Sequence, residues 1–71
     1  MKPVKMTLKE VIQDQLRMAQ IFKNAGKMDD VKSTVEGLID IINQNKNDEY
    51  YIQNKDKIDT IVKGVSKLAG I

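Results

Sequence analysis

The chain has 71 residues, of which 41% are hydrophobic and 31% are charged, and this balance excludes an intrinsically disordered protein. The length allows one domain, residues 1–71, and the absence of Cys and His excludes disulfides and an ordinary zinc site as stabilising elements. The net charge of +2 is small, but residues 1–27 hold six Lys and Arg against two Asp and Glu, so any anion-binding surface is expected there.

The chain begins with a predicted tail, residues 1–6, that leads into a helix-start signal. Thr7 and Glu10 have the spacing of a capping box, in which each side chain accepts a hydrogen bond from the backbone N–H of the other residue. Met6 and Val11 have the spacing of the hydrophobic staple that often accompanies this box. A helix is therefore expected to begin directly after Thr7.

This first helix is predicted over residues 8–25, and Gly26 suits the left-handed residue that follows many helices. Its apolar face is formed by residues at helical spacing: Leu8, Val11, Ile12, Met18, Ala19 and Phe22.

The second helix is predicted over residues 29–43. Asp29 and Asp30 suit its start, because carboxylates cap the free N–H groups and interact favourably with the helix dipole. Its apolar face again repeats at spacings of three and four: Met28, Val31, Val35, Leu38, Ile39 and Ile42.

The third helix is predicted over residues 48–69, after a polar loop. Asn54 interrupts its apolar stripe of Tyr51, Ile58, Ile61, Val65 and Leu68, which Val62 and Ala69 support. Either this helix breaks near residues 53–56, with Asp56 capping a shorter final helix, or Asn54 makes a buried hydrogen bond in a continuous, bent helix. We favour the continuous helix.

Three amphipathic segments with short connections predict an all-α fold, a small three-helix bundle with up-down connectivity. The expected core combines the apolar faces of all three helices: Val11, Ile12, Phe22, Val35, Leu38, Ile58, Ile61, Val65 and Leu68.

No catalytic residues or cofactor site are expected. His is absent, and Ser33 and Ser66 have no neighbouring base in the pattern. The glycines are isolated, so no phosphate-binding loop is indicated. The alternating Asn43, Asn45 and Asn47 resemble the spacing of calcium ligands, but the Gly and the bidentate Glu of an EF-hand loop are missing, so no metal is expected.

Three Ile residues fall off the core stripes and, with Tyr50, which borders the stripe of the third helix, form a candidate protein interface: Ile21, Ile41, Tyr50 and Ile52. Ile21 and Ile41 are expected to come together, since they lie on the same angular side of antiparallel neighbours. Scattered exposed apolar residues are common on small proteins, which is the alternative interpretation. Tyr residues are favoured anchors of protein interfaces.

A second candidate surface is the outer face of the first helix: Lys9, Gln13, Arg17, Gln20, Lys23 and Asn24. Gln, Asn and Arg can read base edges, and Lys can neutralise phosphate. Asp14 lies nearby, and the second helix carries acids on its outer face, which would repel DNA. An ordinary solvated face is the competing interpretation.

The sequence predicts a non-enzymatic protein–protein interaction module that acts as a regulator, inhibitor or assembly subunit and binds another protein or a second copy of itself. The alternative is a weak nucleic-acid-binding module that uses the first helix. No run approaches the roughly 18 apolar residues of a membrane span, so no membrane partner is expected. A cytoplasmic location is expected, and abundant Lys, Ile and Asn with a single Arg indicate a bacterial or phage source.

Overall fold

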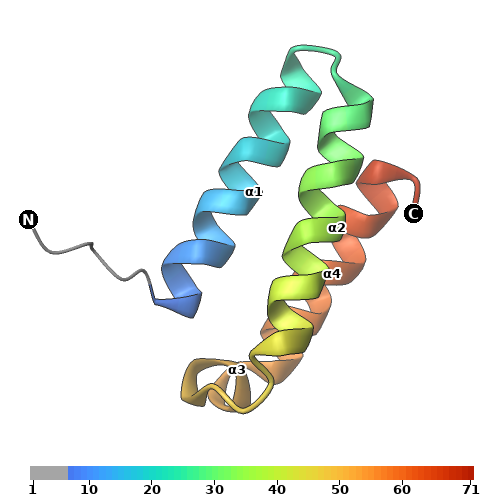
Figure 1. Cartoon of the computed structure of the whole chain (residues 1–71). Helices are drawn as coiled ribbons and strands as arrows, with labels where there is room; N and C mark the ends of the chain where they lie inside the picture. Colours follow the sequence, from blue (N-terminus) through green and yellow to red (C-terminus); the bar gives the residue numbers. More distant parts are fainter. Residues whose placement is uncertain (1–6) are drawn as a thin grey trace, which may run out of the picture.

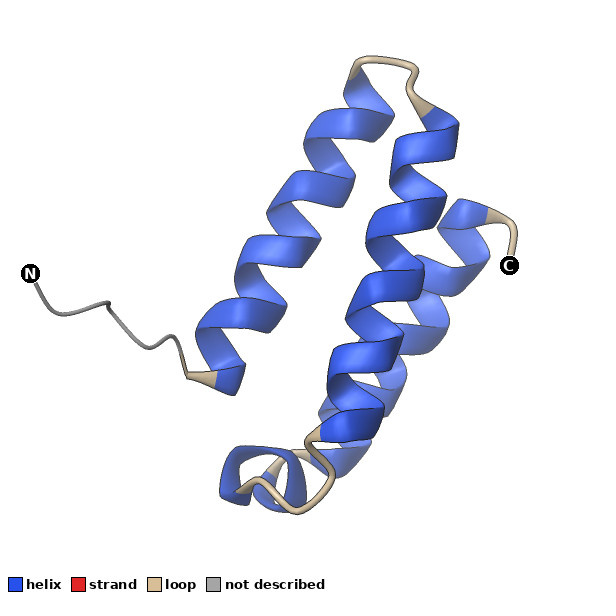
Figure 2. Cartoon of the chain, viewed as in Figure 1, coloured by secondary structure: helices blue, strands red, loops and turns tan. Residues whose placement is uncertain are grey.

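The computed structural model describes residues 7–71, which form four helices (Figures 1 and 2): α1 (Leu8–Asn24), α2 (Met28–Gln44), α3 (Glu49–Gln53) and α4 (Lys55–Ala69). No strand occurs within this range, which confirms the all-α prediction. None of the four helices combines the length and hydrophobicity needed to cross a membrane. The predicted tail, residues 1–6, and the predicted contact between Met6 and Val11 lie outside the described residues.

The start of α1 has the predicted capping box. The Thr7 Oγ1 accepts a hydrogen bond from the Glu10 N–H at 3.2 Å, and Glu10 Oε1 accepts one from the Thr7 N–H at 3.2 Å. The helix ends at Asn24, and Gly26 follows with a φ of 74°, in the left-handed region that glycine adopts without steric cost.

The start of α2 differs from the prediction. The helix begins at Met28, the cap residue is Lys27, and no side chain makes a capping hydrogen bond. Asp29 and Asp30 therefore lie inside the first turn. There they stabilise the helix through its dipole, whereas the predicted capping role is wrong.

The predicted third helix is broken at Asn54, so the preference for a continuous helix is wrong. Asn54 has φ −125° and ψ 24°, which ends α3 and begins α4. Its Nδ2 donates a hydrogen bond to the Tyr50 carbonyl at 3.0 Å, and such a side-chain bond competes with the helical pattern. The break falls within the predicted range 53–56, but Asn54 occupies the cap position that the prediction gave to Asp56.

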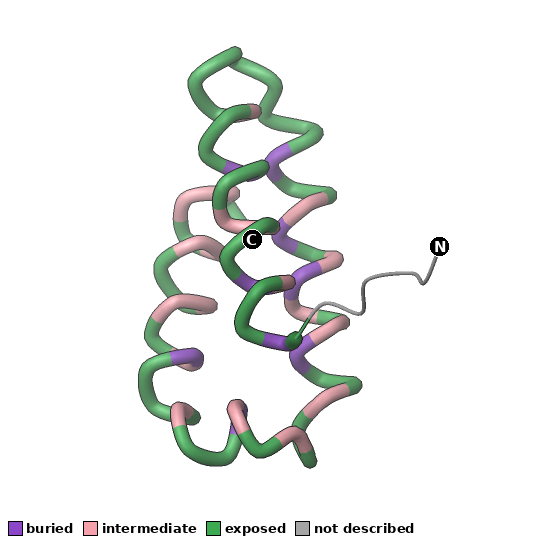
Figure 3. The backbone as a smooth tube through the Cα atoms, turned by 90° about the vertical axis from the view of Figure 1, so that its left-hand side faces the viewer, coloured by how far each residue is buried: buried purple, intermediate pink, exposed green. Residues whose placement is uncertain are grey.

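The helices are arranged around α2, which packs along α1 on one side and along α4 on the other, whereas α1 and α4 scarcely meet (Figures 1 and 3). The short α3 lies at one end of the molecule, where it contacts both α1 and α4. The up-down bundle of three helices is not confirmed in that form, because a fourth helix is present and the outer two long helices make little contact.

The core of the described part of the chain consists of two clusters; Figure 3 colours the buried positions along the backbone. The first contains Leu8, Ile12, Leu38, Ile42, Tyr51 and Ile58, and the second contains Ala19, Val31 and Val35. Val65 packs against both. Among the predicted core residues, those that the structure buries are Ile12, Val35, Leu38 and Ile58, and those that stay half-buried are Val11, Phe22, Ile61, Val65 and Leu68.

Two methionines of the predicted stripes are exposed instead. Met18 retains 36% of its accessible surface and Met28 retains 46%. Leu16, which the predicted stripe omits, packs against the first cluster. Residues at i, i+4 lie on one face of a helix, so the buried face of α1 follows Leu8, Ile12 and Leu16 and turns away from Met18.

Candidate functional site

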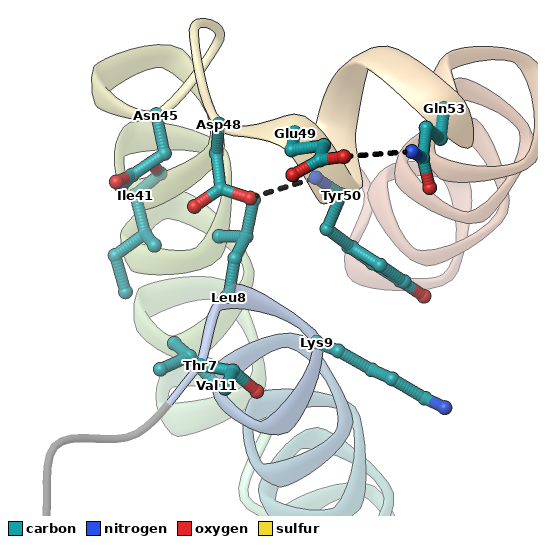
Figure 4. A pocket seen from close by; sticks show the side chains of 10 residues that line it. All are labelled: Thr7, Leu8, Lys9, Val11, Ile41, Asn45, Asp48, Glu49, Tyr50 and Gln53. Atoms are coloured by element: carbon teal, nitrogen blue, oxygen red, sulfur yellow. Dashed lines mark hydrogen bonds between the residues drawn. The ribbon is translucent and has the colours of Figure 1, made fainter.

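A hollow of about 910 Å³, open to solvent, lies beside α3 (Figure 4). We call it the α3 hollow. It is formed where the first turn of α1, the last turn of α2 and the start of α3 meet. The apolar residues that line it are Leu8, Val11, Ile41 and Tyr50, and the polar ones are Thr7, Lys9, Asn45, Asp48, Glu49 and Gln53.

The apolar floor of the α3 hollow is continuous with the core. Leu8 is a buried member of the first cluster, and the half-buried Ile41 and Tyr50 pack against that cluster. Val11 is half-buried on the next turn of α1. The floor is therefore held by the first core cluster while one side of it faces solvent.

Most of the polar residues of the α3 hollow are held by hydrogen bonds to nearby groups. Asp48 caps α3, because its Oδ1 accepts from the Tyr50 N–H at 2.8 Å (Figure 4). Glu49 Oε1 accepts from Gln53 Nε2 at 3.1 Å. Asn45 Nδ2 donates to the Ile41 carbonyl at 2.6 Å and so satisfies a carbonyl at the end of α2. These bonds orient two carboxylates along one edge of the hollow.

The four predicted interface residues lie in three places. Ile41 and Tyr50 line the α3 hollow. Ile52 is 64% exposed and borders a second, smaller hollow of about 440 Å³ at residues 52–57. Ile21 is 52% exposed and lies near the connection between α1 and α2.

The predicted meeting of Ile21 and Ile41 is wrong. The helices α1 and α2 run antiparallel (Figure 1). From the helix bounds, Ile21 lies near their connection, whereas Ile41 lies in the last turn of α2, at the other end of the pair. A shared angular side brings two residues together only when they also lie at the same height along the helix pair.

The six residues of the predicted nucleic-acid face are all exposed on α1: Lys9, Gln13, Arg17, Gln20, Lys23 and Asn24. Gln20 Nε2 donates to Asn24 Oδ1 at 3.1 Å, so these two amides already bond to each other. Unlike the other five residues, Lys9 also borders the α3 hollow. Asp14 is exposed on the same helix, and it reduces the positive potential of that face.

In the polar loop between α2 and α3, two side chains make hydrogen bonds to backbone groups. Asn45 and Asp48 are both engaged in hydrogen bonds to main-chain groups. Within residues 7–71, no group of three or more acidic side chains lies close enough together to hold a metal ion.

The α3 hollow itself was beyond sequence reasoning. Leu8 and Val11 follow the helical apolar pattern, so the pattern places them in the core. The one sequence feature that indicates an unusual position for Leu8 and Val11 is that they lie at the very start of a helix, directly after residues 1–6, which include apolar and basic side chains.

Comparison with protein-family models, with curated proteins and with solved structures finds no match to this chain.

Proposed function

We propose that the protein is a small non-enzymatic docking module, which binds a segment of another protein in the α3 hollow. The observation that carries this proposal is the apolar floor, in which the half-buried Val11, Ile41 and Tyr50 keep part of their surface open to solvent beside the buried core residue Leu8. Contiguous apolar surface rimmed by polar groups is typical of interaction sites, and Tyr is enriched among interface anchors.

The chemistry of the rim indicates the chemistry of the partner. Asp48 and Glu49 supply two carboxylates at the edge of the floor, and Lys9 supplies one cation. A complementary segment therefore carries an aliphatic side chain that reaches the floor and a Lys or Arg beside it. Such a module serves as a regulator, inhibitor or assembly subunit. The absence of Cys is consistent with a reducing compartment, and we place the protein in the cytoplasm.

The proposal is tested by charge reversal at the rim. Partners are captured from an extract of the native host with wild-type protein, Glu49→Lys and Glu36→Lys, and the affinity of each recovered partner is then measured by calorimetry. Glu49 lies on the rim, whereas Glu36 is an exposed acid of α2 that does not line the hollow. We expect Glu49→Lys to weaken binding at least fivefold, because it places a cation opposite the basic partner segment.

Glu36→Lys is the matched control and is expected to bind as the wild type does. Equal binding by all three proteins would contradict the proposal. If Ile21→Lys alone abolished binding, the interface would lie at the other end of the α1–α2 pair. Salt-sensitive binding of duplex DNA that disappears in Arg17→Ala would assign the function to the outer face of α1 instead.

A further inference from the structure

We propose that the exposed Ile52 of a second copy of this chain packs into the α3 hollow, and that two copies do this reciprocally in a two-fold dimer. The inference rests on the proposed function only in that both use the α3 hollow. Residues 52–57 carry the chemistry that the hollow requires of an occupant, an aliphatic side chain with a cation beside it.

The aliphatic side chain is that of Ile52. It is 64% exposed, the largest exposed fraction among the large hydrophobic side chains of the described residues. The neighbouring Tyr51 belongs to the first core cluster, whereas Ile52 lies on the part of α3 that faces solvent. Ile52 does not line the α3 hollow of its own chain, so it enters such a hollow only on another copy.

The cations lie just after Ile52, in the first turn of α4. Lys55 and Lys57 are both exposed there, and with Asp56 between them the turn holds two cations against one acid, a net charge of +1. The surface around Ile52 is therefore slightly positive.

The rim of the α3 hollow has the opposite sign. Asp48 and Glu49 supply two acids against the one cation of Lys9, a net charge of −1 (Figure 4). Opposite charges favour the contact of the Ile52 surface with the rim, and like charges disfavour the contact of two rims with each other. This complementarity indicates which two surfaces meet.

The two halves of the contact adjoin on the molecule. Gln53 lines both the α3 hollow and the smaller hollow at residues 52–57. In a two-fold dimer the same patch is used by both copies, so a contact between two different residues is made twice. Ile52 and the α3 hollow together form such a self-complementary patch. Because the patch centres on a five-residue helix it is small, and the dimer is expected to be weak.

Sedimentation of the full chain at concentrations up to about 1 mM measures the dimer. We expect Ile52→Ser to raise its dissociation constant about tenfold, because Ser removes the apolar surface that the hollow buries. Ile21→Ser is the matched control, since Ile21 is also exposed but lies at the other end of the α1–α2 pair, and it should dimerise as the wild type does. A wild type that stays monomeric, or an Ile52→Ser variant that dimerises equally well, would overturn the inference.

Charge reversal identifies the surfaces that meet. Glu49→Lys alone, and Lys55→Glu/Lys57→Glu alone, should each weaken the dimer, because each places like charges across both contacts. An equimolar mixture of these two variants should form the dimer again, since every contact then joins opposite charges. Glu36→Lys, which does not change the rim, is expected to dimerise as the wild type does. A mixture that stays monomeric would overturn the proposed pairing.

These experiments separate the inference from the proposed function. No partner protein is present during sedimentation, so a monomeric wild type overturns the dimer and leaves the partner experiment untouched. A dimer that depends on Ile52 and reforms in the charge-reversed mixture supports the inference, even where capture of a partner fails and contradicts the proposed function.

Discussion

The pKa of Glu10 is set by the capping box at the start of α1. Hydrogen bonds from the Thr7 backbone N–H and then from the Thr7 hydroxyl lower the pKa of Glu10 below its ordinary value of 4.5, and the small desolvation of the group opposes them. Because the pKa is lowered in the folded state, the interaction stabilises the protein above the unfolded pKa. This stabilisation is lost as the pH falls through the folded pKa.

Glu10→Gln tests this coupling. A Gln side chain can still accept the Thr7 N–H, so we expect a small effect on the melting temperature at pH 7. As the pH falls from 5 to 3, the melting temperature of the wild type should decrease more than that of the variant, because the variant lacks the carboxylate whose pKa is lowered in the folded state. Thermal melts followed by circular dichroism at each pH measure the two slopes, and equal slopes would contradict the assignment.

At the level of helices, the ends that depend on near neighbours were predictable. The Thr7–Glu10 box and the stop at Gly26 require only residues a few positions apart, and the structure confirms both. The break at Asn54 was harder, since two local patterns compete there and only the actual bond to the Tyr50 carbonyl decides between them. The exposure of Met18 was missed because helical spacing alone does not define where a broad apolar face ends.

Two glycines inside helices provide a prediction about helix stability. Apart from their chain neighbours and the backbone of their own helix, Gly37 in α2 and Gly64 in α4 have no group within 4 Å of the place where a Cβ would lie. Replacing either with Ala should raise the free energy of unfolding by about 0.5–1 kcal/mol, because Ala loses less backbone entropy on forming a helix. Urea denaturation followed by circular dichroism measures the change.

Gly26→Ala is the control with the opposite sign. Gly26 has equally open surroundings but a φ of 74°, so Ala is strained there and the variant should be less stable than the wild type. Stabilisation by Gly26→Ala, or destabilisation by both helix-interior variants, would show that the helix boundaries are wrong.

For the whole molecule, the central position of α2 decides how firmly each part is held. α2 contributes four buried residues and α1 three, whereas α4 buries Ile58 alone. The reason is that α4 packs along α2 but scarcely meets α1, so residues such as Ile61 and Leu68 remain half-buried. The sequence pattern predicted that the whole apolar stripe of α4 is buried, because in a closed three-helix bundle both sides of that helix would be covered.

Ile58→Ala should therefore destabilise the protein by about 2–5 kcal/mol, the usual cost of truncating a buried Ile. Ile61→Ala makes the same chemical change on the same helix at a half-buried position, so it should cost clearly less. Urea denaturation of both variants gives the comparison. Equal costs would mean that α4 is covered on both flanks, in contrast to the arrangement described.

The candidate site also depends on how the whole molecule is arranged. Ile41 could be identified from the sequence as an apolar residue off its core stripe and Tyr50 as one that borders its stripe. The α3 hollow, however, requires α1, α2 and α3 to meet, which no local pattern specifies. The separation of Ile21 from Ile41 has the same origin. The spacing of residues in one helix predicts the angle at which a side chain lies around the helix axis. Its height along a pair of helices depends instead on where the connection between them lies.

The short connection between α1 and α2 has a consequence for how the chain folds. It spans residues 25–27, and the two helices it joins supply most of the buried side chains, so the bulk of the core forms between segments close in sequence. Proteins dominated by such local contacts cross their folding barrier in microseconds to milliseconds. We therefore expect the α1–α2 hairpin to form the folding nucleus and α4 to pack onto it afterwards through Ile58, so the C-terminal helix should be the part that detaches most easily.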